Sequence, residues 1–565
     1  MKKWKVDEIN VKKTLRALLC PKFDEYGDRP ALGFYDSVPI TFRELKEKVI
    51  SLSHMLQDHG IIKGDRVAII GENSPNWGIA YLAIVFMGAV AVPILPDFHA
   101  DDMAHILKHS GSRIVFATRR QIEKLSEVDV SGVEHIISLD DFVPERNPVK
   151  TSPISRLIEQ ASELLRSLPS KVGLIKYEPD EDDLAAIVYT SGTTGHSKGV
   201  MLTHYNIASN IIQIDHFFDV TPEDRILSIL PMSHSYENTL GFLYVLYKGA
   251  PIYYIGKKPT PRILQMACAK VRPTVMASVP LIIEKIYKKQ VVPSLQKNLV
   301  IRFLVRNPLT SGMIYRKIGK KLMDFFGGEL RTMSFGGAPL NEKIEQFMRK
   351  CGFPYATGYG MTEASPVVAG AKVNETRPGS VGKPLIDIEV RIENPDPETG
   401  VGEIYLRGPN IMKGYYKNRR LTEEVLTPDG WLKTGDLGYL DDDNYLYIKG
   451  RSKSLILGPS GENIFPEAIE EKFNAHPLVQ ESLVLQNDGR LEAWIYPDYA
   501  MIEDRLEGKS EAERERIMRE ILDEICREVN QKLPAYSKIS RCVEHPEPFE
   551  KTPTLKIKRY LYAKK

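Results

Sequence analysis

The sequence predicts an α/β protein with a large N-terminal domain of layered α/β subdomains and a β-rich subdomain, followed by a small α+β C-terminal domain. Strand and helix patterns alternate through the first two-thirds of the chain, which is typical of layers around parallel sheets. From about Pro384, short segments of alternating polar and apolar residues indicate antiparallel strands. The length of 565 residues exceeds what one hydrophobic core usually supports.

The first elements follow from capping and apolar runs. Thr41 and Glu44 form a capping-box pair ahead of apolar residues at helical spacing. Arg66–Ile70 predicts a buried strand. Leu184–Tyr189 predicts another strand, which runs into a loop rich in Gly, Ser and Thr. We expect a helix after that loop.

Trp77–Leu95 contains 19 residues without a charge, which is the length of a membrane-spanning helix. We instead expect a buried helix that ends at Gly88 and a buried strand over Ala89–Ile94. Pro96 then ends the run. A membrane-anchored structural protein is the alternative that this stretch leaves open.

Two further strand–helix units follow. Thr274–Val279 predicts a strand that leads into a helix from Pro280. Arg331–Phe335 predicts a strand before a helix that has Pro339 near its start and Gly352 just past its end.

We place a domain boundary near Gly450–Lys453, which divides the chain into residues 1–450 and 451–565. The second part is long enough for a small domain. Its predicted helix Glu511–Leu533 carries apolar residues on one face. These residues are Ile517, Ile521, Ile525 and Val529.

Composition excludes several classes of protein. Lys and Arg number 76 and Asp and Glu number 74, so a net charge of +2 predicts no nucleic-acid partner. A local basic patch for a membrane surface remains open. Five widely spaced cysteines without a C-x-x-C argue against zinc and disulfides and favour a reducing compartment. We find no signal peptide and predict a cytoplasmic protein, with peripheral membrane contact as an open alternative.

Tyr189–Val200 (YTSGTTGHSKGV) is the most informative segment. Ser191 to Gly199 contain three glycines, four hydroxyl groups and Lys198. Glycines let successive N–H groups point at one anion, hydroxyls donate to phosphate oxygens, and lysine adds positive charge. The order of Ser197, Lys198 and Gly199 differs from the Walker pattern. The segment therefore predicts a phosphate-binding loop of another kind.

This segment resembles the signature of the superfamily of acyl-CoA synthetases, peptide-synthetase adenylation domains and beetle luciferases. The resemblance covers roughly residues 25–565 and is closest to long-chain fatty-acid CoA ligases. It implies that the loop binds ATP. The residues implied are Ser191, Gly192, Thr193, Thr194, Gly195, Ser197 and Lys198.

Three segments in the middle of the chain match in order. PMSHSYENT (231–239) resembles a family segment with a His or aromatic residue near the acyl pocket, which implies that position for His234, and Glu237 resembles a glutamate of long-chain members. SFGGAPL (334–340) resembles the turn that carries adenine. YATGYGMTEASP (355–366) resembles a segment that binds adenine, phosphate and Mg²⁺, and one carboxylate with ATP phosphates suits Mg²⁺. The resemblance implies that Gly337, Ala338, Pro339, Tyr359 and Gly360 bind the nucleotide, that Thr362 contacts phosphate, and that Glu363 holds Mg²⁺.

The remaining motifs lie toward the C-terminus. WLKTGDL (431–437) implies that Asp436 binds both ribose hydroxyls, and GRSK (450–453) implies a nucleotide contact from Arg451 and a hinge at Lys453. GPSGENIFP (458–466) resembles a loop of the thioester-forming state. KTPTLKIKR (551–559) implies that Lys556 approaches the carboxylate and α-phosphate, with Lys558 as its rival.

The resemblance implies an enzyme that uses ATP and Mg²⁺ to turn a fatty acid into acyl-AMP and pyrophosphate, then transfers the acyl group to CoA. It also implies rotation of the C-terminal domain about Lys453. We expect medium-to-long chains, with apolar helices at 265–268 and 309–323 beside the tail. An acyl–acyl carrier protein ligase and a non-catalytic acyl-adenylate binding protein are the alternatives, and the oligomeric state stays open.

Overall fold

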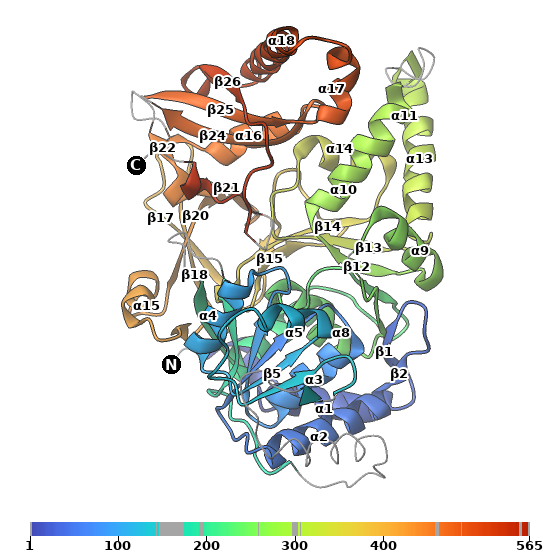
Figure 1. Ribbon diagram of the computed structural model, residues 1–565, viewed down its shortest axis with the longest axis vertical. Coiled ribbons are helices and arrows are strands. Elements are labelled where there is room, and N and C mark those ends of the chain that lie inside the picture. The colour runs from blue at the N-terminus through green and yellow to red at the C-terminus, as the bar shows by residue number, and fades with distance from the viewer. Residues whose placement is uncertain are drawn as a thin grey trace.

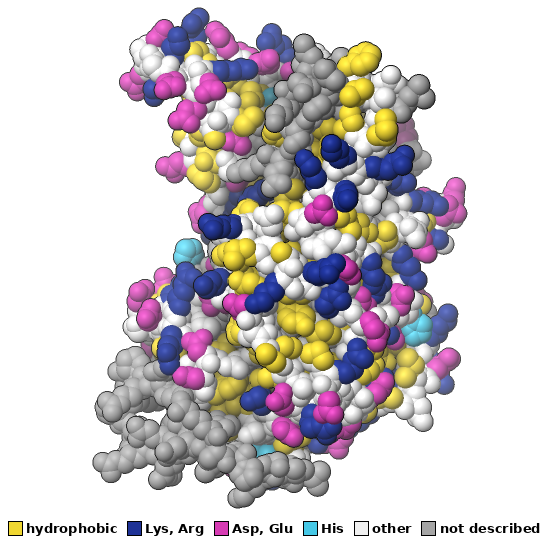
Figure 2. All heavy atoms as spheres, turned by 90° about the vertical axis from the view of Figure 1, so that its right-hand side faces the viewer, with side chains coloured by type: hydrophobic (Ala, Val, Ile, Leu, Met, Phe, Trp, Pro, Cys, Tyr) yellow, Lys and Arg dark blue, Asp and Glu magenta, His cyan; other side chains and the backbone are white. Residues whose placement is uncertain are grey.

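The computed structural model describes residues 3–142, 144–145, 175–190, 197–257, 259–296, 303–304, 307–457, 463–487, 489–552 and 556–562. The molecule is elongated, with the first helices at one end and the last elements at the other (Figure 1). Charged and hydrophobic side chains are interspersed over the face in Figure 2. The predicted α/β class is confirmed.

One large sheet has eight strands. It is parallel from β8 to β6 and gains antiparallel strands at both edges. In spatial order the strands are β19 (Gly414–Tyr415), β9 (Lys198–Thr203), β8 (Leu184–Thr190), β4 (Val90–Ile94), β3 (Arg66–Ile70), β5 (Ile114–Ala117), β6 (His135–Ser138) and β7 (Pro144–Glu145).

A second large sheet has nine strands, and its central strands are parallel. In spatial order they are β16 (Lys383–Pro384), β15 (Val367–Ala371), β14 (Tyr355–Gly360), β13 (Thr332–Phe335), β12 (Val275–Ser278), β10 (Ile226–Ser228), β11 (Ile252–Tyr254), β1 (Pro30–Phe34) and β2 (Ile40–Thr41).

Helices pack around these two sheets (Figure 1). In chain order, the described helices from residue 15 to residue 248 are α1 (Leu15–Tyr26), α2 (Phe42–Asp58), α3 (Pro75–Phe86), α4 (Ala100–Ser110), α5 (Arg119–Leu125), α7 (His204–Asp215), the π-helix η2 (Glu237–Leu243) and α8 (Tyr244–Lys248). Those that follow are α9 (Pro261–Val271), α10 (Pro280–Ile286), the π-helix η3 (Tyr287–Val291), α11 (Val292–Gln296), α13 (Pro308–Phe325) and α14 (Glu342–Cys351).

Three small sheets complete the described part of the chain. An antiparallel four-stranded sheet confirms the predicted β-rich region and contains β17 (Glu389–Glu393), β18 (Gly402–Arg407), β20 (Leu432–Leu440) and β21 (Leu446–Arg451). A two-stranded sheet has β22 (Ile456–Leu457) and β23 (Asn463–Ile464). The last has β24 (Val479–Asn487), β25 (Arg490–Pro497) and β26 (Arg541–Glu544). The remaining helices are η1 (Lys5–Glu8), η4 (Thr362–Ala364), α15 (Arg419–Val425), η5 (Ser452–Ser454), α16 (Pro466–Asn474), α17 (Tyr499–Leu506), α18 (Glu511–Asn530), η6 (Ala535–Ser537) and η7 (Arg559–Leu561).

Several local predictions are confirmed. Thr41 and Glu44 form the capping box of α2. The uncharged stretch from Trp77 forms α3 and β4, separated by Gly88 in a left-handed conformation. No helix in the part of the chain that is described has the length and apolar character needed to cross a membrane. Ile521, Ile525 and Val529 of α18 are buried, so their shared face packs into a core.

Two predictions are wrong in detail. The loop after β8 does not lead into a helix, because Lys198–Thr203 forms β9, antiparallel to β8, and α7 begins only at His204 behind the Thr203 cap. Apolar side chains at Val200 and Leu202 favour burial in the sheet. Likewise α14 begins at Glu342, later than Pro339, because Asn341 accepts the hydrogen bond that caps it.

Candidate active site

The first cluster of side chains is centred on the carboxylate of Glu363 in η4, which is contacted by residues of the strands β9 and β19. Lys198, at the start of β9, donates a 3.0 Å hydrogen bond to Glu363 Oε1, and the hydroxyl of Tyr415 donates one of 2.8 Å to the same oxygen. Lys198 also donates to the Tyr415 hydroxyl at 2.6 Å and lies 4.3 Å from the centre of its ring. The strand β19 places Tyr415 there by pairing with Val200 of β9.

This arrangement keeps Glu363 ionised. The side chain is 7% exposed, and burial alone would raise the pKa of its carboxyl. The charge of Lys198 and the hydrogen bonds from Lys198 and Tyr415 outweigh burial, so the pKa of Glu363 is lowered. The site therefore holds a buried anion that can attract a second cation.

The second cluster lies on the four-stranded sheet. Asp436 of β20 stands opposite Arg451 of β21, and Arg451 Nε lies 3.0 Å from Asp436 Oδ1. The hydroxyl of Tyr359, at the end of β14, donates a 2.5 Å hydrogen bond to Asp436 Oδ2. Burial and the neighbouring Asp436 raise the pKa of Tyr359, so its hydroxyl stays protonated. Strand register thus brings all three predicted nucleotide contacts together.

Thr362 and His234 approach each other through the loop before η2. Thr362 Oγ1 is 3.1 Å from Ser235 Oγ, next to His234. The backbone N–H of Tyr236 donates to His234 Nδ1 at 3.2 Å, so the neutral ring carries its proton on Nε2. Burial and the positive charge of Lys556 lower the pKa of His234 to about 4. His234 is therefore neutral at physiological pH.

Lys556 reaches this region from the C-terminal residues. Lys556 is exposed as a whole residue, yet protein atoms crowd its ammonium group and lower its pKa, and the charge of Arg451 adds to this effect. Asp436 and Glu363 oppose it by raising the pKa of Lys556. These interactions place one lysine within electrostatic reach of both clusters.

Lys558 is occupied elsewhere. It forms a 2.5 Å ion pair with Glu550, and the next residue, Arg559, makes two hydrogen bonds to Glu470 at 2.7 and 2.8 Å. The ion pair with Glu550 therefore favours Lys556 over Lys558 as the lysine that approaches the site.

The turn predicted to carry adenine follows β13. Gly337 has φ of +81°, a conformation that favours glycine, and Gly337, Ala338 and Pro339 are exposed. Beside them, a Cβ added at Gly336 would lie 3.1 Å from the ring of Tyr236. The hydroxyl of Tyr236 donates to the carbonyl of Ser334 at 3.1 Å, which fixes the ring below the turn.

Not every predicted residue joins these clusters. Ser191, Gly192, Thr193, Thr194 and Gly195 lie outside the described residues, as do residues 458–462 of the predicted thioester-state loop. Ser197 is half-buried beside Lys198, Gly360 is exposed at the end of β14, and Lys453 is exposed in η5.

Sequence reasoning missed Tyr415 and Ser235. Tyr415 belongs to no motif that we recognised, and only the pairing of β19 with β9 brings it to Glu363. Ser235 lies inside PMSHSYENT, so its neighbour His234 was a usable signal.

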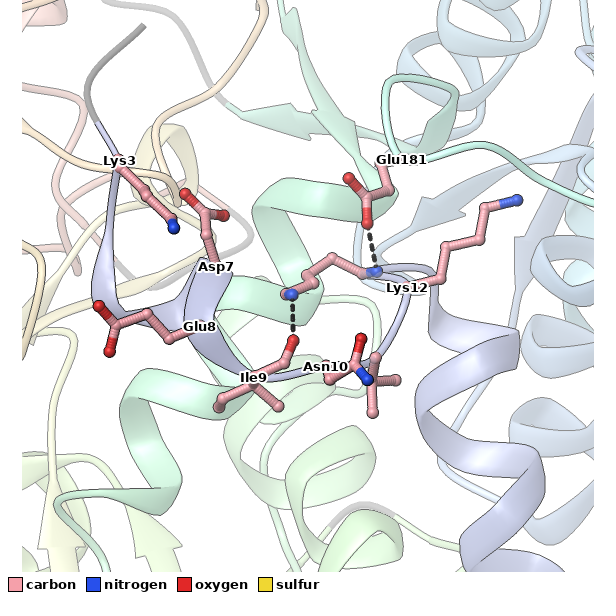
Figure 3. A pocket seen from close by; sticks show the side chains of 9 residues that line it. Lys3, Asp7, Glu8, Ile9, Asn10, Lys12 and Glu181 are labelled. Atoms are coloured by element: carbon pink, nitrogen blue, oxygen red, sulfur yellow. Dashed lines mark hydrogen bonds between the residues drawn. The ribbon is translucent and has the colours of Figure 1, made fainter.

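A hollow of about 760 Å³ lies apart from these residues, at the N-terminal segment (Figure 3). It is lined by residues of both charge signs, among them Lys3, Asp7 and Lys12. The backbone N–H of Lys13 donates to Glu181 at 2.6 Å, and its ammonium donates to the carbonyl of Ile9 at 2.6 Å. No predicted site residue is among the described residues that line it.

Comparison with known proteins gives three findings. The model of the family described as "AMP-binding enzyme" matches residues 22–416. The peroxisomal long chain acyl-CoA synthetase 6 of Arabidopsis thaliana is 31% identical over 463 residues, which cover 77% of this chain and 64% of that protein. The chloroplastic long-chain-fatty-acid–[acyl-carrier-protein] ligase AEE15 of the same plant is 28% identical over 550 residues, covering 84% and 75%.

A solved structure shows the same fold. ATP-bound MatB from Rhodopseudomonas palustris superposes with a TM-score of 0.74 at 24% identity, and the match covers 97% of this chain and 98% of that one. The agreement extends over both the large sheets and the C-terminal elements.

Proposed function

Because the chain belongs to the AMP-binding enzyme family, we propose that it is an AMP-forming acid–thiol ligase that activates a fatty acid with ATP and transfers it to CoA. The observation that carries the proposal is the ion pair of Lys198 with the buried carboxylate of Glu363, within electrostatic reach of Lys556. Two lysines and one ionised carboxylate there suit a reaction between two anions.

In the first half-reaction, a carboxylate oxygen of the acid forms a bond to the α-phosphorus of ATP. The bond from this phosphorus to the bridging oxygen breaks, and pyrophosphate leaves. Lys198 and Lys556 offset the repulsion between the anions and stabilise the charge of the transition state. Positioning and charge stabilisation suffice, so no protein nucleophile is required.

Glu363 fits a role in holding magnesium. In the described ranges, no group of three or more His, Cys, Asp or Glu side chains is arranged to hold a metal ion. A single ionised carboxylate matches an ion that arrives on ATP and takes its other ligands from phosphate and water. Bound Mg²⁺ supplies positive charge to the phosphates.

The second cluster suits the nucleoside. Asp436 is 4% exposed and, as a carboxylate, accepts hydrogen bonds from two ribose hydroxyls. Tyr359 and the turn Gly337–Pro339 offer an aromatic ring and a small-residue surface for adenine. Arg451 adds positive charge beside Asp436.

In the second half-reaction, the sulfur of the thiol attacks the carbonyl carbon of acyl-AMP. The bond from carbon to the phosphate oxygen breaks, AMP leaves, and the thiol proton passes to solvent. We propose that residues 451–565 form a separate domain that turns about Lys453 between the two steps. Their own hydrophobic core, which includes Phe473, Ile495 and Ile525, supports this division.

The identity of the acid rests on the relatives. The Arabidopsis relative that is 31% identical is named a long chain acyl-CoA synthetase, which favours a fatty acid as the substrate. AEE15 favours a second candidate, an acyl–acyl carrier protein ligase with the same first half-reaction. A non-catalytic binding protein is disfavoured because such a protein would be expected to have lost Lys556 or Glu363, and both are present.

Pyrophosphate–ATP exchange over carboxylic acids from acetate to long-chain fatty acids tests the proposal. We expect exchange that depends on a fatty acid, falls about 100-fold in Lys556→Ala and persists in the matched control Lys558→Ala. Adding CoA or a holo acyl carrier protein then identifies the acceptor by its thioester. A folded, ATP-binding protein that supports no exchange with any acid overturns the proposal.

A further inference from the structure

Positive charge is concentrated in one part of the chain. Residues 257–331 contain 16 Lys and Arg and 3 Asp and Glu, a net charge of +13, whereas the whole chain carries +2. The other residues together therefore carry −11. A field of one sign over one region attracts an anionic partner.

The helix α13 presents much of this charge on one face. Arg316, Lys317, Lys320 and Lys321 follow helical spacing and are all exposed. Met313 lies on the same stripe, and its side chain is 63% exposed. Basic residues and an exposed methionine thus share one surface.

The helix α9, which packs against α13, repeats this pattern. Arg262, Met266 and Lys270 are spaced four residues apart and lie exposed on one stripe, with Met266 54% exposed. Both helices lie side by side at the edge of the molecule in Figure 1, and Figure 2 turns this edge toward the viewer. There Lys and Arg side chains gather beside hydrophobic ones in the upper half.

A further exposed apolar side chain lies just before α13 in the chain. Phe303 is 69% exposed, and its carbonyl accepts a hydrogen bond from the N–H of Asn307, just before α13 begins. We call the exposed stripes of α9 and α13 together with Phe303 the basic–apolar face.

Ion pairing distinguishes the basic side chains of this face from those at its margin. Among the described residues, no salt bridge involves Arg262, Lys270 or the four basic residues of α13. At its margin, by contrast, Arg272 pairs with Glu329 and Arg331 with Asp224. The charge on the face is thus free to meet a ligand.

We propose that the basic–apolar face docks the protein on the surface of an anionic phospholipid bilayer. Lys and Arg attract acidic headgroups while their aliphatic stems lie along apolar surface, and exposed Met and Phe enter the interface. The apolar side chains stand singly among the charges, without a described groove for a partner helix. A fluid interface suits such a face better than a folded acidic protein does.

Sedimentation of the full chain with vesicles tests this proposal without reference to catalysis. We expect binding to vesicles of phosphatidylcholine mixed with phosphatidylglycerol, little binding to phosphatidylcholine alone, and release as salt increases. Changing Arg316, Lys317, Lys320 and Lys321 together to Gln should weaken binding by tenfold or more, at about a fivefold loss per charge close to the bilayer. Met266→Ser with Met313→Ser should weaken it further.

A matched control removes the same charge from another exposed helix. Arg514, Arg516, Arg519 and Arg527 of α18 alternate with glutamates, so their change to Gln should leave vesicle binding unaltered. Thermal unfolding confirms that each variant is folded. The proposal is overturned if the native chain ignores anionic vesicles, if both variants lose binding equally, or if the α13 variant loses only binding to an acidic carrier protein.

Discussion

The hydroxyl of Tyr415 donates a hydrogen bond to Oε1 of Glu363, the oxygen that also accepts from Lys198. Two donors on one oxygen hold this carboxylate in a fixed direction and keep it ionised although it is buried. Tyr415 thus positions a group that we propose to act on Mg·ATP.

Tyr415→Phe tests this positioning role. The change removes one hydrogen bond to an ionised group, worth about 1.5 kcal/mol, so exchange should slow roughly tenfold and the pKa of Glu363 should rise. The pH at which activity is half lost on the acid side should rise with it. Tyr416→Phe is the control, because its hydroxyl makes a 3.5 Å contact with Ser110 instead. Equal rates and pH profiles in both variants would contradict the role.

The buried carboxyl of Glu237 should make stability depend on pH. Burial raises its pKa to about 8, although the hydrogen bond from Ser228 acts to lower it. The other carboxyl oxygen, Oε2, has no hydrogen-bond partner within the described part of the protein. Between about pH 5 and 8 the folded chain keeps a proton that the unfolded chain releases. Stability contributed by Glu237 is therefore present at low pH and lost as pH rises, by up to about 1.4 kcal/mol per unit.

Glu237→Gln should remove this part of the slope. Urea unfolding at about pH 5 and pH 8 gives the difference in free energy of unfolding for both proteins. Exposed Glu329→Gln serves as control and should keep the native slope. A Glu237→Gln protein whose slope equals the native one refutes the raised pKa.

Gly360 is required by close packing of the backbone. A Cβ at this position would lie 2.0 Å from the carbonyl oxygen of Pro366, and pairing of β14 with β15 resists any shift. Gly360→Ala should lower the free energy of unfolding by about 3 kcal/mol and displace Thr362 and Glu363. Calorimetry measures the loss. In Gly132→Ala, where the added carbon meets nothing within 4 Å, the melting temperature should stay unchanged.

Lys288 connects the π-helix η3 to the C-terminal residues. Its ammonium donates to the carbonyl oxygens of Asn474 at 2.5 Å and Val479 at 3.2 Å. If this contact holds the orientation in which Lys556 meets the site, Lys288→Ala should slow acyl-AMP formation about tenfold and spare thioester formation from supplied acyl-AMP. Single-turnover measurements separate the steps. The control is Lys285→Ala, at an exposed neighbouring position, which should keep the native rate of acyl-AMP formation. If both variants slow acyl-AMP formation equally, the contact of Lys288 does not hold this orientation.

The sequence predictions that the structure confirms in detail depend on local signals. The capping box at Thr41, the strand at 66–70 and the break at Gly88 depend on neighbours in the chain, so short windows contain the information. The segment Lys198–Thr203 was misread because its strand conformation comes from pairing with β8, and sequence spacing does not encode that partner.

The candidate site likewise contains residues that local motifs identify and contacts that depend on the three-dimensional fold. Motifs located Glu363, Asp436 and Lys198, but the hydrogen bond from Tyr415 and the contacts of Lys288 join residues far apart in the chain. Such pairs depend on the order of strands in the sheets and on how the C-terminal residues pack against the rest of the protein. The proposed roles of the motif residues remain predictions that the variants above address.

Arg451 faces Asp436 across the sheet, and the next residue, Ser452, donates to the carbonyl of Gly435 at 3.2 Å. The chain is thus fastened to β20, the strand that carries Asp436, immediately before Lys453. If Lys453 is the pivot and Asp436 binds ribose as proposed, nucleotide binding and the orientation of the C-terminal residues are coupled by a shared free energy. The two orientations then differ in nucleotide affinity by the same factor by which bound nucleotide shifts the equilibrium between them, and a substitution that favours one orientation changes nucleotide affinity in the corresponding direction.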